Sequence, residues 1–220
     1  KSLTECGHQY MLQLILNEAF FIGLLSATVR MMVPILMTAL GETFSERSGV
    51  MNIGLEGIMI IGALAGFVAA YYLNSAAIGL LVGALSGLLM GFLISYLSVT
   101  LNINQMISGV AINMFGLGIT SLLYRMIFGV MVIPPQAPTL IVYPIPLLSE
   151  IPLIGDILFN HNILVYSLYI LVPVSVIVFK KTTYGLSLRA VGEHPYAAET
   201  MGVSVKSIRY SAVCICGACC

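Results

Sequence analysis

The sequence contains no tryptophan and little charge. Only 8% of its 220 residues are charged, against roughly 25% in an ordinary soluble domain. Between Glu56 and Arg125, 68 consecutive residues include no Asp, Glu, Lys or Arg, whereas about 20 apolar residues are enough to cross a bilayer. This excludes a soluble globular protein. The apolar runs are also too long and too numerous to be a removable signal peptide.

Motifs for covalent or redox chemistry are missing as well. No GxxxxGK[ST] phosphate-binding loop occurs, so the chain cannot bind and hydrolyse ATP in the P-loop manner by itself. The three histidines have no metal-ligand spacing. Nine Lys and Arg residues balance nine Asp and Glu residues, without a basic cluster in the first half, which argues against a nucleic-acid partner. We expect no enzyme activity, no cofactor and no metal site.

Four of the five cysteines lie between Cys214 and Cys220, and Cys216 and Cys219 have the CxxC spacing of some metal sites. The cluster falls in an apolar run without a nearby histidine. We interpret these cysteines as small apolar residues that pack inside a membrane helix. The alternative is a membrane enzyme that uses the cluster.

The apolar runs predict an all-α, polytopic bundle of helices in the lipid bilayer. Spans are expected at residues 19–40, 55–73, 76–99, 105–128 and 163–179, with a sixth that starts near Ser207. Turn-forming residues at Asn74–Ser75 and Asn102–Asn104 separate the second, third and fourth spans. The chain begins with Lys1 rather than Met, and its last apolar run reaches Cys220, so we expect a fragment truncated at the C-terminus.

The positive charges predict the orientation of the spans, because cytoplasmic loops retain Lys and Arg. Five of the nine positive residues lie in or beside the loop 180–206, at Lys180, Lys181, Arg189, Lys206 and Arg209. The Pro-rich stretch 129–160 contains Glu150 and Asp156 but no Lys or Arg. We expect loop 180–206 to be cytoplasmic and stretch 129–160 to be external. Counting back places residue 1 outside, unless Ser48–Gly57 enters the membrane without crossing it.

Small residues recur every four positions in the third span. They are Gly79, Gly83, Gly87, Gly91 and Ser95. Such residues share a helix face, and small side chains let helix backbones approach closely in lipid, where no hydrophobic drive brings helices together. Gly62 and Gly66 repeat the spacing in the second span. The stripe predicts tight helix packing, with a substrate groove as the alternative.

Arg30 lies near the middle of the first span, where a charge costs roughly 2.5 to 3.5 kcal/mol. We therefore expect it not to face lipid. One interpretation is an ion pair with Glu56, or hydrogen bonds to backbone carbonyls that Pro34 leaves free. The other is that Arg30 and Glu56 border a polar translocation path.

Uncharged hydrogen-bonding residues gather at the start of the fourth span. Among them, Gln105 and Asn113 share a helix face with Gly109, which suits a neutral solute better than an ion. The alternative is hydrogen bonding between helices. The residues expected to line the substrate pathway are Arg30, Asn52, Glu56, Asn104, Gln105, Ser108 and Asn113.

A short helix is expected inside loop 180–206. Pro195 is typical of a first helical turn and Gly202 of a helix terminator, so the sequence predicts a helix from Pro195 to Met201. Ser204 can then cap the next span.

Two segments carry a family resemblance. The run Ala197–Gly202 resembles the EAA-type motif in the cytoplasmic coupling loop of ABC importer permeases. The run Ala39–Gly57 is similar to the signature of the nucleoside and simple-sugar branch of the ribose and branched-chain amino acid permease family. His194 departs from the pattern, because relatives are expected to have Asn there and His is a poorer cap.

The resemblance implies an ABC importer permease of the bacterial cytoplasmic (inner) membrane, with residues 1–220 as one incomplete, multi-pass permease domain. It would move a nucleoside or simple sugar delivered by an extracytoplasmic solute-binding protein, and pair with a second permease subunit. The residues expected to contact the cytoplasmic ATP-binding subunit are Pro195, Tyr196, Ala197, Ala198, Glu199 and Gly202. The alternative is an ion-coupled secondary transporter, which would need titratable groups at mid-membrane. Apart from Arg30, the expected spans contain no charged residue at mid-membrane.

Overall fold

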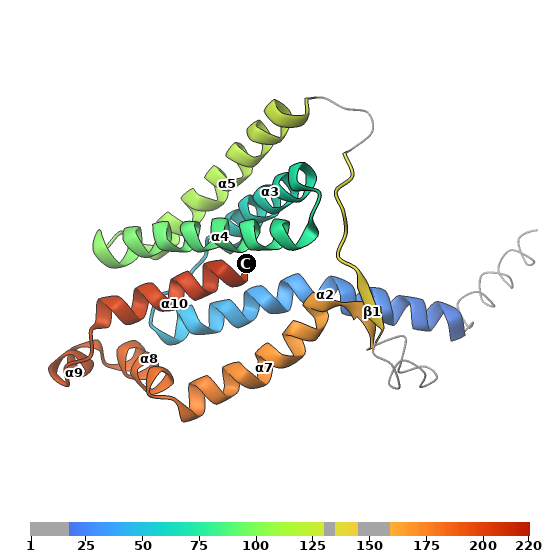
Figure 1. The fold of residues 1–220 in the computed structure, drawn as a ribbon. Coiled ribbons are helices and arrows are strands. Elements are labelled where there is room, and N and C mark those ends of the chain that lie inside the picture. The colour runs from blue at the N-terminus through green and yellow to red at the C-terminus, as the bar shows by residue number, and fades with distance from the viewer. Residues whose placement is uncertain (1–17, 130–134, 145–158) are drawn as a thin grey trace, which may run out of the picture. The chain divides into compact units, whose positions relative to one another are not determined.

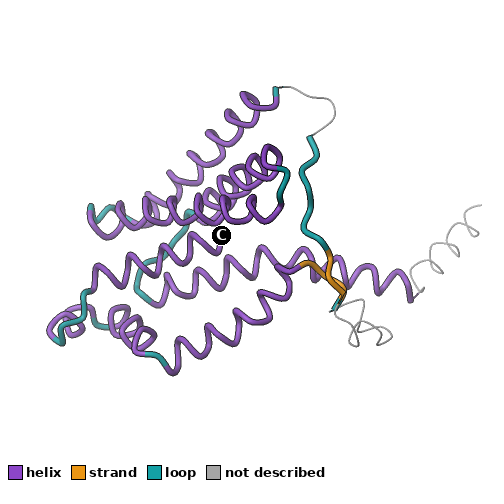
Figure 2. Tube along the Cα trace, viewed as in Figure 1, coloured by secondary structure: helices purple, strands orange, loops and turns teal. Residues whose placement is uncertain are grey.

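The computed structural model describes residues 18–129, 135–144 and 159–220, and most of these are helical (Figures 1 and 2). The helices are α2 (Glu18–Arg47), α3 (Leu55–Leu73), α4 (Ala76–Ser95), the π-helix η1 (Tyr96–Thr100), α5 (Gln105–Phe128), α7 (Ile163–Lys181), α8 (Thr183–Glu193), α9 (Pro195–Thr200) and α10 (Val205–Cys219). The strands are β1 (Val142–Pro144) and β2 (Asn160–Asn162).

Five helical segments in the described part of the chain are long and apolar enough to cross a membrane: α2, α3, α4 with η1, α5 and α7. This confirms the predicted helical bundle and places the spans within a few residues of their expected limits. The largest difference is at α2, which continues seven residues beyond the expected end at residue 40. The segment α10 begins two residues before the expected start of the sixth span.

The chain forms two compact units, one of residues 1–35 and 141–170 and one of residues 36–140 and 171–220. In the first unit β1 and β2 pair antiparallel, with Tyr143 opposite His161. The Tyr166 hydroxyl lies 2.7 Å from the carbonyl oxygen of Phe159 and 2.9 Å from that of Tyr143, so it links β1 to the residue that precedes β2. Most of the Pro-rich stretch 129–160 lies outside the described residues.

In the second unit, α3 packs against α4 and α5, and α10 packs against α4 (Figure 1). The glycine stripe of α4 serves two neighbouring helices. A methyl group on Gly79 would lie 2.7 Å from the Gly66 carbonyl oxygen of α3. A methyl group on Gly87 would lie 2.1 Å from the Gly217 carbonyl oxygen of α10. The stripe therefore packs helices tightly, as predicted, and the backbones of α3 and α10 occupy the space that the groove alternative requires.

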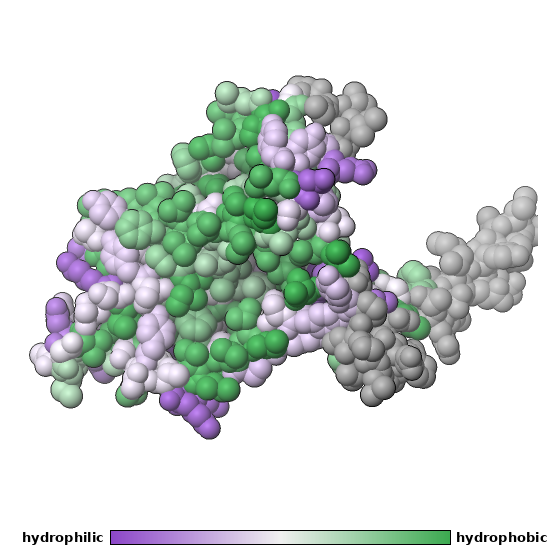
Figure 3. Space-filling view, in the orientation of Figure 1, coloured by the Kyte–Doolittle hydropathy of each residue, from purple (hydrophilic) through white to green (hydrophobic). Residues whose placement is uncertain are grey.

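The outer surfaces of this unit are apolar. Leu81 and Leu89 of α4 are 63% and 67% exposed, and Met114 of α5 is 71% exposed. Figure 3 shows hydrophobic residues over much of the visible face of α4 and α5. Such surfaces are expected where lipid, rather than water, surrounds a helix.

Replacing Gly87 with Val should destabilise the second unit, because the side chain must displace the α10 backbone. Overpacking of this kind costs about 1 to 3 kcal/mol. The matched control is Gly118→Val in α5, where an added methyl group meets nothing within 4 Å. Thermal unfolding of both variants in detergent tests the prediction. Equal melting temperatures for Gly87→Val and Gly118→Val would contradict it.

Candidate functional site

The candidate site is built around residues 48–54, here called the connector, which join α2 to α3. Helix α2 ends at Arg47, and Gly49 follows with φ of +82°, a left-handed conformation that glycine adopts without steric cost. The Ser48 and Val50 amides donate to the Ser45 carbonyl oxygen at 3.0 and 3.2 Å. The chain therefore leaves the helix in a tight turn and continues without regular structure to Leu55.

Side chains from two other helices hold the connector backbone. From α5, the Gln105 Oε1 accepts from the Met51 amide at 2.9 Å, and the Asn113 Nδ2 donates to the Ile53 carbonyl oxygen at 3.0 Å. From α10, the Arg209 Nε donates to the Ser48 carbonyl oxygen at 3.3 Å. Irregular backbone between membrane helices is tolerated only when its polar groups find such partners.

Glu42 of α2 holds the middle of the connector. Its Oε1 accepts from the Asn52 amide at 2.9 Å, and its Oε2 accepts from the Cys216 thiol at 3.3 Å. Asn52 is 3% exposed, and its Oδ1 accepts from the Gly54 amide at 3.1 Å. A carboxylate, an amide and a thiol from three segments thus form one hydrogen-bonded cluster.

The predicted shared face of α5 is present and packs against the connector. Gly109 lies between Gln105 and Asn113, and a methyl group there would be 2.8 Å from the Ile53 Cβ. The Asn113 Oδ1 also accepts from the Gly57 amide at 2.7 Å. Both ends of the Asn113 amide are therefore engaged by backbone, which favours the interhelical hydrogen-bonding interpretation for this residue.

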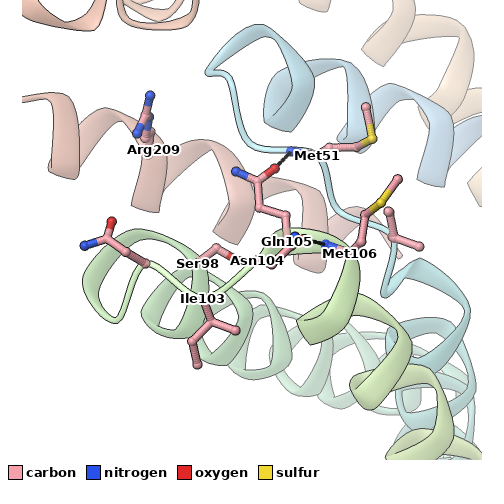
Figure 4. A pocket seen from close by; sticks show the side chains of 9 residues that line it. Met51, Ser98, Ile103, Asn104, Gln105, Met106 and Arg209 are labelled. Carbon is pink, nitrogen blue, oxygen red and sulfur yellow. Dashed lines mark hydrogen bonds between the residues drawn. The ribbon is translucent and has the colours of Figure 1, made fainter.

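A cavity of about 450 Å³ opens beside the connector (Figure 4). This volume lies within the range of small-molecule pockets, roughly 300 to 1,000 Å³. Its lining comes from the connector, η1, the turn before α5, the first turn of α5, and α10, as Met51, Ile53, Ser98, Asn102, Ile103, Asn104, Gln105, Met106 and Arg209. The cavity is therefore open and mostly uncharged, with one cationic side chain at its edge.

Of the predicted pathway residues, Asn104 and Gln105 line this cavity. Ser108 is buried next to it, with its Oγ 3.5 Å from the Ser98 Oγ. Asn104 caps α5, because its Oδ1 accepts from the Met106 amide at 2.9 Å. The fold therefore brings together the Asn104 and Gln105 amides and the Ser108 hydroxyl group, which are also close in the sequence.

Arg30 and Glu56 are both exposed side chains. Arg30 belongs to the first unit and Glu56, in the first turn of α3, to the second. Their pairing, and their place beside a path, stay predictions.

The cysteines of α10 are packing residues, and one of them, Cys216, also donates to the Glu42 cluster. Cys216 is fully buried, and a methyl group on Gly41 of α2 would lie 2.9 Å from the Cys219 Cβ. All four cysteines from Cys214 to Cys220 are free. Within residues 18–129, 135–144 and 159–220, no group of three or more His, Cys, Asp or Glu residues could hold a metal ion.

The segment 180–206 contains the predicted short helix. Helix α9 begins at Pro195 and ends one residue earlier than expected, at Thr200. Gly202 has φ of +84°, as expected of a helix terminator, and the Ser204 side chain accepts from the Ser207 amide, as expected of a cap on α10. His194 precedes α9 without a side-chain hydrogen bond to it, as expected of a poor cap.

The exposed side chains of α9 form a compact surface. Tyr196 is 85% exposed and Met201, at the C-cap, is 84% exposed. Glu199 is also exposed, whereas Ala198 is buried at 5%. Ala198 therefore packs α9 against its own segment, and its exposed neighbours are free to meet another surface.

Sequence reasoning missed several residues of this region. Helix α8 was not expected, although Thr182 caps it by accepting from the Gly185 amide at 3.1 Å. Glu42 lies beyond the expected end of the first span at residue 40, yet it belongs to α2. Arg209 was used only as a charge for orientation, and its contact with Ser48 joins segments 161 positions apart. The sequence holds one signal for α8: Thr182 is a typical N-cap residue, and apolar positions follow it.

Replacing Asn113 with Leu should destabilise the connector, because the Gly57 amide and the Ile53 carbonyl group lose their partner. Each buried polar group left without a hydrogen bond costs about 1 to 3 kcal/mol. Met114→Leu, at the exposed neighbouring position, is the control and should have little effect. Melting temperatures in detergent compare the two. An Asn113→Leu variant as stable as Met114→Leu would show that these bonds do not hold the connector.

Known proteins match the chain over most of its length. The family model for the permease component of branched-chain amino acid transport systems matches residues 24–220. The chain is 39% identical over 198 residues to the guanosine ABC transporter permease protein NupQ of Bacillus subtilis (strain 168), which covers 87% of the chain and 62% of that relative. No solved structure matches the chain.

Two further relatives are permeases of the same kind. The putative glucose ABC transporter permease protein TsgC13 of Haloferax volcanii is 36% identical over 90% of the chain and 60% of its own length. The nucleoside ABC transporter permease protein NupC of Lactococcus lactis subsp. cremoris is 36% identical over 84% of the chain and 60% of its own length. The chain thus spans about 60% of the length of these relatives.

The matches confirm the resemblance seen in the sequence, and the five apolar helices make the protein a multi-pass membrane protein. With a family match that covers almost all of its described residues, the chain belongs to the permease components of the branched-chain amino acid transport system family.

Proposed function

We propose that the chain is part of the membrane-spanning permease of an ATP-driven importer that carries a nucleoside or a simple sugar. The carrying observation is 36% to 39% identity, over 84% to 90% of the chain, to permeases named for guanosine, nucleosides and glucose. The chain has no P-loop of its own, so the energy would come from a cytoplasmic ATP-binding subunit. A second permease subunit and an extracytoplasmic solute-binding protein complete the proposed assembly.

The proposed location is the bacterial cytoplasmic membrane, with the cavity and α8 to α10 on the cytoplasmic side. Lys180 and Lys181 end α7, Arg189 lies within α8, and Lys206 and Arg209 lie in the first turns of α10. These positive residues support a cytoplasmic position under the positive-inside rule. The Pro-rich stretch 129–160 then lies outside, where a binding protein would dock.

The proposed solute path includes the cavity beside the connector. Gln105 and Asn104 would border it. Ser108 would lie behind Ser98, which lines the cavity. Asn52 and Asn113 would shape the cavity by holding the connector. Arg30 and Glu56 are kept as border residues of the path on the sequence argument alone. Amides and hydroxyls support a neutral solute, because they satisfy hydrogen-bonding groups without burying an unpaired charge.

The proposed contact with the ATP-binding subunit is the exposed surface of α9. Pro195 starts this helix, Gly202 ends it and Ala198 anchors it, while Tyr196, Ala197 and Glu199 are exposed on its surface. A soluble motor can drive a helix bundle only through a rigid contact, and α9, with Ala198 packed beneath it and the Ser204-capped start of α10 after it, would supply one.

The first functional test uses the intact gene, co-expressed with its ATP-binding subunit and binding protein. Uptake of labelled nucleosides or of a simple sugar should occur, and should persist when an ionophore collapses ion gradients. Loss of uptake with the ionophore alone would favour an ion-coupled secondary transporter. Uptake of branched-chain amino acids, without nucleosides or sugars, would overturn the proposed solute class.

The second test changes the α9 surface in the same system. Glu199→Arg reverses an exposed charge, and Gly202→Val forces a β-branched residue into φ of +84°, at a cost of order 1 to 3 kcal/mol. Both variants should lose most of the co-purifying ATP-binding subunit and most solute-stimulated ATP hydrolysis. Glu46→Arg, an exposed charge reversal at the end of α2, is the control. If both α9 variants behave like this control, α9 is not the coupling element.

A further inference from the structure

The Gln105 side chain has two ends with different surroundings. Its Oε1 accepts from the Met51 amide, and a backbone N–H can only donate, so this contact fixes which end of the amide is oxygen. Figure 4 shows the Gln105 nitrogen turned away from Met51, on the side where Arg209 lies. Among the described residues no group accepts from this nitrogen. The fold therefore holds a donor of fixed orientation at the edge of the cavity.

The side chains around this donor suit a flat, uncharged ring. Met51 and Met106 line the cavity beside Gln105 and are 51% and 62% exposed, and thioethers make favourable contacts with aromatic rings. Arg209 lines the cavity with a planar guanidinium group, which stacks on aromatic faces. Asn102 and Asn104 add two exposed amides to the same lining.

We infer that Gln105 is a specificity-determining residue that donates a hydrogen bond to a ring nitrogen or carbonyl oxygen on the base of a nucleoside. This inference rests on the proposed function and names the part of the solute that the cavity reads. A base presents acceptors at fixed places in its plane, which a fixed donor can select. A sugar hydroxyl rotates and can donate or accept, so it does not require a donor of fixed orientation.

The variant Gln105→Glu separates this role from the structural one. A carboxylate keeps an oxygen for the Met51 amide, so the connector stays held, but it places an acceptor where the donor was. Asn74→Asp makes the same amide-to-carboxylate change at an exposed position that does not line the cavity. Unchanged melting temperatures for both variants establish that the fold is intact.

The probe is purine riboside, whose base carries ring-nitrogen acceptors and no donor. In the intact importer, Gln105→Glu should raise the KM for purine riboside uptake by roughly 10- to 100-fold, because one hydrogen bond is lost and a carboxylate oxygen then faces a ring nitrogen, which is also an acceptor. Asn74→Asp should leave this KM unchanged. An unchanged KM in Gln105→Glu, in an importer that carries nucleosides, overturns this inference alone. An importer that carries no nucleoside overturns the proposed function instead.

A second measurement covers the case in which Gln105→Glu does not fold. In the intact permease in inside-out vesicles, Asn102→Cys should add labelling by a water-soluble maleimide to that of the parent protein, whose native cysteines from Cys214 to Cys220 are free. Purine riboside should slow this reaction and ribose should not. No added labelling of Asn102→Cys would show that the cavity is filled in the intact permease. Equal protection by ribose would assign the cavity to the sugar, and stronger protection by purine riboside 5′-phosphate would assign it to an anion. Each of these three results overturns the inference.

Discussion

The need to satisfy backbone polar groups between membrane helices decides how this permease unit is built. Seven residues without regular structure join α2 to α3, and lipid offers no water to hydrogen-bond them. Glu42, Gln105, Asn113 and Arg209 reach these residues from three helices. Once these bonds are made, the relative positions of α2, α5 and α10 in the second unit are fixed at one place. The cavity is the space that remains beside them.

Close backbone contact makes this arrangement possible. The glycines of α4 bring its backbone close to the backbones of α3 and α10, and Gly109 brings α5 close to the connector. In lipid no hydrophobic force pulls these helices together, so contact area and interhelical hydrogen bonds must do so. A larger side chain at Gly109 would press on Ile53, and would then pull Met51 away from Gln105. Packing and polar recognition are therefore coupled in this region.

Patterns local in sequence predicted most of the fold. Long apolar runs gave the spans, a four-residue period gave the packing stripe, and Pro195 and Gly202 gave the limits of α9. The hydrogen bonds of the connector could not be predicted this way, because they join residues such as Arg209 and Ser48 that are 161 positions apart. The sequence identifies amides at the start of α5 as functional candidates. It does not show which of their atoms hydrogen-bond to the connector backbone and which stay available to a solute. Asn113 uses both ends of its amide on backbone, whereas Gln105 uses one.

The same hydrogen bonds relate the two proposed activities of the unit. Arg209 lies seven residues after Gly202, in the helix that follows α9, and holds Ser48 at one end of the connector. Gln105 holds Met51 three residues further along. A methyl group on Gly192, at the end of α8, would lie 2.2 Å from the Arg47 carbonyl oxygen, so α8 also abuts the start of the connector. Helices α8 and α10 cannot shift relative to α5 without straining or breaking these contacts. In the proposed assembly, a load applied at α9 would therefore reach the cavity wall through the seven residues of the connector. Gln105, the side chain that holds Met51 there, is the one proposed to donate to the solute.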